Sequence, residues 1–556
     1  MNWSKIFVPS ACGTCSCGAA WDKCDVSDDW LDVEGCHVAY LYDFRCVNVY
    51  YRPCSTCTNK KRYDGMENNV LWFGSFSISH AVLKDYIRHF LVSSLPMYKY
   101  YVTYVQRQVM SGNLNFSGII TYTKFRLAVT AMIRLLDIDF VDAFHCNICG
   151  KHTKKVVMDG TALGIQKTFL PRKVAPPEGP TMDGSRFETQ NFLNRKRQRE
   201  LLKKFIKNQI TEDELVELTS EISSPGLKVL IVSLREEHFG VTFPEPCIRL
   251  LKALASDKPV CAIVPAVREV KDFLIRIVNG ANPKDNPLSD LQLLHEQVPL
   301  LFCLCNHFAE LPNPIRVLCG EMVAKASSPF TDQNGCERLP HNLRQVQCDG
   351  QLGFFPSLPS LVERGHYVLD TKRAGHLDDC AKGVRSKKKH GSLIPGIFLI
   401  LCPHGIYYGF QVMPDHESPN VPFTILRTRF SEAPELVIYD NACKLHEYCL
   451  NRNPAFLKKS KFIVDKFHWR NHSGCSEGYD INRYPILKTH NSQAAEQCNS
   501  VLKPIASMVS YMEYDNFLLF SKLYIWYRNM LRIIKCNPGR DVPERETFLP
   551  ISNIIK

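Results

Sequence analysis

Short apolar runs separated by turns predict the strands of a buried sheet in this chain. These runs are rich in β-branched and aromatic residues, and they cover residues 154–165, 396–401, 406–413 and 436–439. The second and third runs flank a Cys-Pro-His-Gly sequence that fits the turn of a β-hairpin. The first run contains Asp159, and the last ends on Asp440. Because open α/β folds keep their chemistry at the carboxyl ends of central strands, Asp440 is a candidate site residue.

Apolar residues at positions i, i+3 and i+4 predict helices elsewhere in the chain. Such spacing occurs between residues 70 and 136 and through much of 226–320. Later in the chain, Asn491-Ser492-Gln493 can cap a helix that carries Glu496 and continues with apolar residues at helical spacing. Residues 511–535 form a further long apolar and aromatic helix pattern, typical of a core helix.

Composition limits the classes of protein that these elements can form. With 556 residues, 45% of them hydrophobic, the chain can bury large cores and is expected to form more than one domain. Its formal net charge of +12 permits nucleic-acid binding without requiring it. No uninterrupted apolar run approaches the roughly 20 residues of a membrane helix, and the first residues lack the apolar stretch of a secretion signal. We therefore expect an intracellular chain with no membrane partner, in which the 24 cysteines indicate zinc rather than disulfides.

Eight cysteines gather in the first part of the chain, and two Cys-x-x-Cys pairs lie at a spacing that lets two thiolates share one tetrahedral zinc. The eight are Cys12, Cys15, Cys17, Cys24, Cys36, Cys46, Cys54 and Cys57. They can fill two zinc sites that hold a small antiparallel sheet together, although the spacing leaves the pairing open. Buried structural cysteines without metal are the alternative interpretation.

Three further Cys/His sets lie later in the chain, and each has a plainer alternative. Cys146 and Cys149, beside two histidines, resemble a zinc knuckle. The second set, Cys380, His390, Cys402 and His404, frames a basic loop and could form a zinc clip or only the turn of the hairpin. The third set is His468, His472 and Cys475, to which Cys443 or His446 could add a ligand. Core histidines bonded to the backbone are the alternative for this set.

The segment around this third set carries a family resemblance. Asp465-Lys466-Phe467-His468, followed by His472 and Cys475, resembles the Asp/Cys-x-x-His signature that several eukaryotic cut-and-paste transposases place between their last two catalytic carboxylates. Taken with YDNACKLHEYCLNRNP before it and NSQAAEQCNS after it, the run resembles the Kyakuja-Dileera-Zisupton (KDZ) transposases, over about residues 140–170 and 375–530. It is most similar to the branch found in HMG domain-containing protein 3, although no segment here resembles an HMG box.

The resemblance implies an α/β chain with an RNase H-like core, the fold of transposases with an Asp-Asp-Glu centre. It implies that Asp159, Asp440 and Glu496 are the catalytic carboxylates. The rivals for the first position are Asp349 and Asp370, and a turn-forming Asp-Gly is the plainer interpretation of Asp159 itself. Carboxylates suit the hard ion Mg²⁺, whereas the Cys/His sets suit Zn²⁺, so the two metals need not compete for ligands.

These patterns together predict an order of segments along the chain. A cysteine-rich zinc module at 1–69 precedes a helical connector at 70–144 and a zinc knuckle with the first core strand at 145–170. A linker and a mostly helical insertion at 171–375 then interrupt the core, which resumes at 376–556. The insertion begins with a basic helix whose charges could contact DNA, serve as a nuclear-import signal or only form a solvated face. They are Arg195, Lys196, Arg197, Arg199, Lys203 and Lys204.

The expected function is that of a transposase-like protein that binds DNA and cleaves and transfers its strands with bound metal. The alternative is a domesticated, catalytically silent DNA- or protein-binding factor derived from a transposase. A zinc-binding scaffold for protein partners is a third class, which would require the family resemblance to be accidental. We expect a nuclear location, DNA as partner and a chain compatible with a homo-oligomer.

Overall fold

The computed structural model describes residues 5–21, 25–171, 192–237, 352–358, 392–450, 460–470, 479–484 and 489–536, with a few isolated positions between them. The chain is mixed α/β and divides into two compact units. Unit 1 comprises Met1–Asp139 together with Ser507–Lys556, and unit 2 comprises Phe140–Ala506. Among the described helices, none is both long enough and apolar enough to cross a membrane.

Unit 1 is built on a five-stranded sheet with the order β1-β3-β2-β7-β6. Its strands are β1 (Lys5–Phe7), β2 (Leu31–Ala39), β3 (Phe44–Tyr50), β6 (Val70–Trp72) and β7 (Phe76–Ser79), and β4 (Arg52–Pro53) pairs separately with β5 (Lys60–Lys61). The pairs β2/β3, β4/β5 and β6/β7 are antiparallel, as the sequence predicts for this segment, whereas β1/β3 and β2/β7 are parallel, so the five-stranded sheet is mixed. A long connection separates the partners in each parallel pair, and such a connection allows parallel pairing.

Helices of unit 1 come from both ends of the sequence. The helices are α1 (His80–Ser93), α2 (Met97–Met110), α3 (Phe116–Ile119), α4 (Tyr122–Leu135) and α20 (Tyr514–Cys536). The ring of Phe90 on α1 packs edge-on against Phe520 and Tyr524 on α20, with centroids 5.3 and 5.6 Å apart. The helical pattern predicted between residues 70 and 136 is confirmed from residue 80 onwards, whereas the first ten residues form strands β6 and β7.

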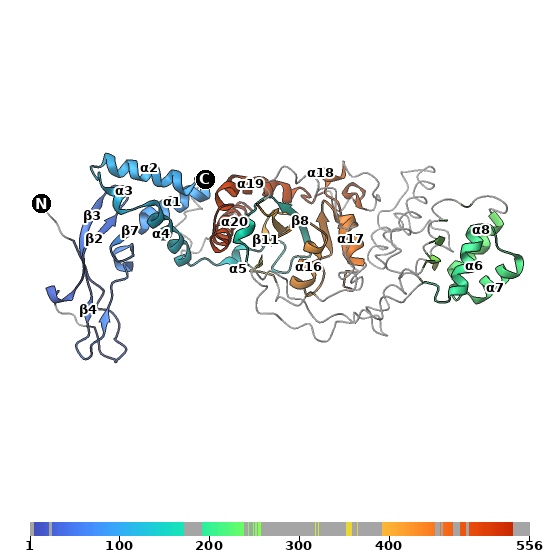
Figure 1. Cartoon of the computed structure of the whole chain (residues 1–556), viewed down its shortest axis with the longest axis horizontal. Helices are drawn as coiled ribbons and strands as arrows, with labels where there is room; N and C mark the ends of the chain where they lie inside the picture. Colours follow the sequence, from blue (N-terminus) through green and yellow to red (C-terminus); the bar gives the residue numbers. More distant parts are fainter. Residues whose placement is uncertain are drawn as a thin grey trace. The chain divides into compact units, whose positions relative to one another are not determined.

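Unit 2 contains a six-stranded sheet with the order β13-β12-β8-β10-β11-β9, and Figure 1 labels two of its strands, β8 and β11. The strands are β8 (Lys155–Thr161), β9 (Gly353–Phe354), β10 (Gly396–Leu401), β11 (Tyr407–Met413), β12 (Leu436–Tyr439) and β13 (Lys461–Ile463). Strands β8, β10, β11 and β9 pair antiparallel, while β12 lies parallel to both β8 and β13. Every residue of β10 and of β12 is buried, which explains their uninterrupted apolar sequences. The predicted hairpin is confirmed as β10 and β11.

Helices and short turns complete the core of unit 2. They are α5 (Phe140–Ala143), α16 (Asn420–Arg429), α17 (Ala442–Leu450), α18 (Lys466–Trp469) and α19 (Ala494–Val509). Helix α17 packs against α16, β12 and β13, and the ring of His446 on α17 stacks on Phe462 of β13 at 4.5 Å between centroids. Short 3-10 helices occur in both units at η1 (Asp28–Trp30), η2 (Met66–Asn68), η3 (Lys167–Phe169) and η9 (Ile481–Arg483).

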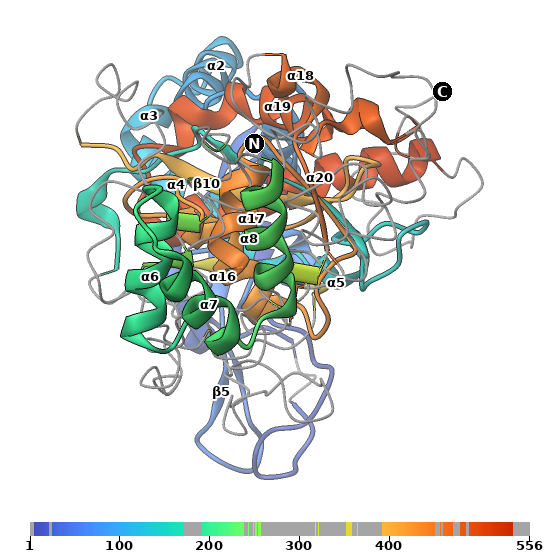
Figure 2. The ribbon, with the colours of Figure 1, turned by 90° about the vertical axis from the view of Figure 1, so that its right-hand side faces the viewer.

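Within the described residues, the range 171–375 predicted as an insertion contains three helices and also β9, which belongs to the core sheet, so the core resumes before residue 376. The three helices are α6 (Lys196–Ile206), α7 (Glu212–Glu221) and α8 (Pro225–Glu237), and Figure 2 shows them grouped together. Thr211 begins α7 with a capping box, in which its side chain accepts from the Glu214 backbone N–H and the Glu214 carboxylate accepts from the Thr211 backbone N–H. Most of the remaining insertion lies outside the described residues.

Candidate carboxylate and metal site

Two aspartates far apart in the sequence meet at one edge of the unit 2 sheet. Strand β12 pairs in parallel with β8, and Tyr439 lies opposite Met158. The next residue on each chain segment is an aspartate, Asp440 after Tyr439 and Asp159 after Met158. Carboxylate oxygens of Asp159, Asp440 and Glu417 all lie within 4.8 Å of one another. Strands β8 and β12 are neighbours, so the structure brings together the two aspartates that the sequence offers as candidates. Three carboxylates so close together repel one another unless a proton or a cation intervenes.

Glu417 is the member of this group that sequence reasoning missed. It lies in the turn between β11 and α16, and Tyr439 donates a hydrogen bond of 2.8 Å to its Oε1. A Cβ atom at Gly160 would lie 2.4 Å from Glu417 Oε2, so the bare backbone of Gly160 makes room for this carboxylate. The turn around Glu417 matches no motif. The only local sign in the sequence that another side chain approaches Asp159 is the glycine that follows it.

Asp159 is held by hydrogen bonds to both of its carboxylate oxygens. The backbone N–H of Gly160 donates to Oδ1 at 2.9 Å, and Asn499 Nδ2 donates to Oδ2 at 2.7 Å. Asn499 is buried on α19, one helical turn after Glu496, so a single helix face presents both side chains to the sheet. Sequence reasoning missed Asn499, although its spacing from Glu496 could have suggested it.

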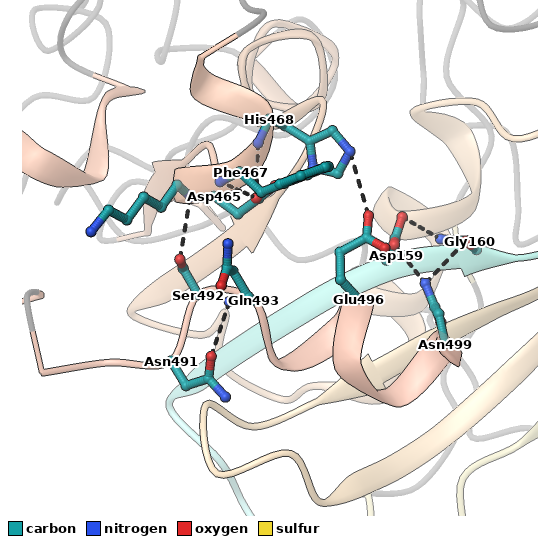
Figure 3. A network of polar contacts seen from close by, with 11 residues as sticks. Asp159, Gly160, Asp465, Phe467, His468, Asn491, Ser492, Gln493, Glu496 and Asn499 are labelled. Carbon is teal, nitrogen blue, oxygen red and sulfur yellow. Dashed lines mark hydrogen bonds and ion pairs between the residues drawn. The ribbon is translucent and has the colours of Figure 1, made fainter. Parts of the chain in front are cut away.

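Glu496 belongs to a second part of the same site, which Figure 3 shows. His468 Nε2 lies 3.5 Å from Glu496 Oε1, and His468 Nδ1 lies 2.6 Å from Asp465 Oδ2. Asp465 also caps helix α18 by accepting from the backbone N–H groups of Phe467 and His468. The side chains of Asp159, Asp440, Asp465, His468 and Glu496 line one small cavity. Both ring nitrogens of His468 thus face carboxylates within the described structure.

A Cys/His cluster lies at the start of β8. Cys146 and Cys149 from the knuckle meet Cys402 and His404 from the β10–β11 turn, and their ligand atoms lie within 4.8 Å of one another. The three sulfurs lie 3.3–3.9 Å from His404 Nδ1. Zinc bonds of about 2.3 Å to sulfur and 2.0–2.1 Å to nitrogen imply tetrahedral ligand separations of about 3.6–3.8 Å. This cluster therefore fits zinc.

The local backbone explains how these four ligands come together. Gly150 and Gly405 both have positive φ angles, of 73° and 76°, which close the knuckle and the hairpin turn. The Tyr408 hydroxyl joins the two turns, since it accepts from the Cys146 N–H and donates to the Gly150 carbonyl. Hydrogen bonds from Cys149 and Cys402 lower the pKa of the Cys146 thiol, which favours the thiolate form that a metal ligand requires.

A second cluster in unit 1 consists of Cys15, Cys17, Cys54 and Cys57, all within 4.8 Å. Its sulfurs lie 3.6 Å apart for Cys15 and Cys57 and also for Cys17 and Cys54, again near the tetrahedral separation. A backbone hydrogen bond at Cys17 is the main cause that lowers the pKa of Cys15 to about 6. The first ligand pair is thus Cys15-x-Cys17, rather than the Cys12-x-x-Cys15 pair that the spacing suggests.

Other predicted ligands lie apart from these clusters or outside the described residues. Cys12 and Cys46 are exposed, and buried Cys36 bonds to the Ser77 hydroxyl. His446 Nδ1 bonds to the Tyr479 hydroxyl in the core. The remaining residues lie outside the part of the chain that the structure describes; they are Cys24, Cys380, His390, His472 and Cys475, with the rival aspartates Asp349 and Asp370.

The predicted DNA-contacting charges of α6 largely face acidic side chains. Arg197 forms a bidentate pair with Glu217, Lys204 pairs with Glu214, and Arg195 lies 3.6 Å from Glu221. Within α6, Lys196 lies 4.0 Å from Glu200. Arg199 is buried and donates to the carbonyls of Leu193 and Asn194. Ion pairs thus engage four of the six predicted residues, namely Arg195, Lys196, Arg197 and Lys204, within the described part of the chain.

Comparison with protein families gives the origin of this part of the chain. Residues 359–528 match the family model described as Kyakuja-Dileera-Zisupton transposase. The chain therefore contains a KDZ-type transposase segment. The segment includes Glu417, Asp440, His468 and Glu496, whereas Asp159 precedes it. No curated protein and no solved structure matches the chain. The narrower likeness to HMG domain-containing protein 3 stays a prediction.

Proposed function

We propose that this chain is a transposase-derived protein whose unit 2 cleaves and transfers DNA strands in a metal-dependent reaction. The observation that carries the proposal is the meeting of Asp159, Asp440 and Glu417 at one sheet edge, beside Glu496 from α19. The match of residues 359–528 to KDZ transposases supports it independently, since that match does not depend on Asp159.

The topology of unit 2 supports an RNase H-like core. The hairpin β10–β11 pairs with β8, and β12 returns in parallel on the other side of β8, which brings the two aspartates together. A helix, α19, then presents the glutamate. This is the layout that the resemblance implies for an Asp-Asp-Glu centre, with the helices α6–α8 inserted after the first strand.

The carboxylate group fits divalent Mg²⁺. Its donors are hard oxygen atoms, and no sulfur or imidazole ligand belongs to the Asp159, Glu417 and Asp440 set. Bound ions at such a cluster activate the attacking water or 3′-hydroxyl and stabilise the leaving oxyanion. The Cys/His cluster beside β8 and the four-cysteine cluster of unit 1 suit structural Zn²⁺ instead.

The surrounding residues would prepare this site before substrate arrives. Asn499 and the Gly160 N–H fix the Asp159 carboxylate in one orientation. His468, oriented by Asp465, holds Glu496 from the other side. Such supporting hydrogen bonds orient metal ligands, and their loss typically costs ~10–100-fold in metal affinity or activity. We infer a nuclear protein with DNA as its partner, in which the ion pairs of α6 leave less of its charge for phosphate than the sequence suggests.

Nicking of supercoiled DNA by the purified full-length chain tests the proposal. Wild-type protein is expected to nick in Mg²⁺ or Mn²⁺, whereas Asp440→Ala should abolish nicking and leave DNA affinity equal or slightly higher, because one carboxylate that repels the phosphates is gone. Wild-type protein that binds DNA but never nicks it with either ion would support the domesticated, catalytically silent factor. Wild-type protein that neither binds nor nicks DNA would contradict the proposal and leave only the zinc-binding scaffold.

A further inference from the structure

A second cavity of unit 2 lies beside the Cys/His cluster, with a volume of about 600 Å³. Three segments line it: the residues that lead from the knuckle into β8, the turn of the β10–β11 hairpin, and residues 489–491 before α19. This cavity and the carboxylate cavity are lined by consecutive residues: Asn491 lines this cavity, and Ser492 lines the carboxylate cavity. The function proposed above assigns no role to this cavity.

Two lysines, Lys154 and Lys155, and two histidines, His152 and His490, line this cavity, and none of the described residues that line it is an aspartate or a glutamate. Lys154 lies 2.8 Å from Glu435, so its charge is neutralised at the rim. The Lys155 ammonium instead donates to His490 Nε2 at 2.9 Å, and no ion pair of Lys155 occurs within the described residues. A neutral imidazole accepts that bond without cancelling the positive charge.

Lys155 and the carboxylate site are aligned along the same strand. Side chains alternate along a strand, so Lys155 at the start of β8 and Asp159 point to the same face of the sheet. The four intervening steps span roughly 13 Å at ~3.3 Å per residue. Residues 490–499 follow this face in the same direction, since His490 contacts Lys155 and Asn499 contacts Asp159.

We propose that this cavity binds a phosphodiester of the DNA strand that enters the carboxylate site, with Lys155 as the principal contact. This inference rests on the proposed function and adds a second anchoring point on the strand. Neighbouring phosphates of one strand are separated by more than the ~3.4 Å axial rise of B-form DNA, so a distance of roughly 13 Å places the anchored phosphate fewer than four nucleotides from the scissile one. Anchoring at that distance would align the strand with the ions.

Binding of a labelled single-stranded oligodeoxynucleotide to the full-length chain, in EDTA so that nothing is cleaved, tests the inference. Each phosphate contact on single-stranded DNA contributes about 0.7 to the slope of log affinity against log salt. Lys155→Gln is expected to reduce that slope by about 0.7 and to weaken binding several-fold at low salt. Lys155→Arg should restore both values, because it keeps the charge. Lys503→Gln, an exposed lysine on α19 outside the cavity, is the matched control and should change neither.

Replacing single phosphates by uncharged methylphosphonates locates the contact. For wild-type protein, one position fewer than four nucleotides from the site of cleavage should be sensitive, and Lys155→Gln should abolish that sensitivity. Equal slopes and equal sensitivity profiles for Lys155→Gln and wild type would overturn the inference, while nicking in Mg²⁺ would leave the proposed function standing. A Lys155-dependent contact without any nicking would support the cavity's role and contradict strand cleavage. Absence of DNA binding by wild-type protein would contradict both.

Discussion

Gly160→Ala is expected to weaken divalent-metal binding without adding or removing a charge. The new Cβ would lie 2.4 Å from Glu417 Oε2 and 2.8 Å from its Cδ, whereas ordinary contact begins near 3.4 Å. The Glu417 carboxylate must therefore move by about 1 Å, which exceeds the ~0.2 Å tolerance of metal–ligand distances. The φ of Gly160 is not in the positive region, so alanine fits the strand backbone itself.

The cost to stability should be small beside the cost to metal binding. Displacing Glu417 breaks its hydrogen bond from Tyr439, a bond to a charged group worth ~1.5–3 kcal/mol. Alanine is more favourable than glycine inside a strand by ~0.5–1 kcal/mol, which offsets part of this loss. We expect a net destabilisation of about 1–2 kcal/mol in the metal-free protein. Metal affinity should fall by at least ~10–100-fold, the cost reported even for residues that only support ligands.

Titration calorimetry with Mn²⁺ measures the affinity, and thermal unfolding measures the stability. Gly118→Ala is the matched control, because nothing lies within 4 Å of the added Cβ there. Glu417→Gln should weaken Mn²⁺ by a similar factor, and the double variant should lose little more, because both changes remove one ligand. If Gly160→Ala and Glu417→Gln both bind Mn²⁺ as wild type does, Glu417 is not a ligand and the reasoning is refuted.

Two further predictions concern the zinc clusters and Asn499. Elemental analysis of the wild-type protein should find about two zinc ions per chain, one for each described cluster. Cys402→Ser should lose about one zinc ion, whereas Cys46→Ser should lose none. Equal zinc contents of wild type and both variants would contradict the assigned ligand set. Asn499→Ala should destabilise the metal-free protein by ~1.5–3 kcal/mol, because a buried hydrogen bond to a carboxylate is lost, and should lower Mn²⁺ affinity ~10–100-fold. Unchanged calorimetric titrations of Asn499→Ala would show that Asn499 does not orient Asp159.

Local pattern was sufficient for much of the unit 2 sheet. The runs at β10 and β12 are apolar throughout because these strands are buried on both faces, and this signal predicts both strands and the hairpin turn. It also places Asp159 and Asp440 on strands. That the two strands are neighbours followed from the family resemblance, because pairing across so long a separation leaves no local trace.

Contacts made through loops and distant helices could not be read from the sequence. Glu417 enters the carboxylate site from a turn that matches no sequence motif. The absence of a side chain at Gly160 leaves the space that its carboxylate occupies. Cys402 and His404 join the knuckle cysteines rather than forming an isolated clip, because the pairing of β10 with β8 brings their turn to Cys146. Helix α20 was predicted as a core helix, but its partners on α1 come from the other end of the chain.

Metal-dependent nicking by Asp159→Asn tests the central claim most directly, because Asp159 lies outside the segment that matches the transposase family. The substitution keeps the shape and removes the charge from the carboxylate that Asn499 and Gly160 orient. Asp415→Asn, an exposed aspartate next to the Glu417 turn, is the control. We predict that wild type and Asp415→Asn nick DNA in Mn²⁺ and stop in EDTA, while Asp159→Asn binds DNA and does not nick. Equal nicking by Asp159→Asn and wild type would contradict a carboxylate centre formed by β8 and β12.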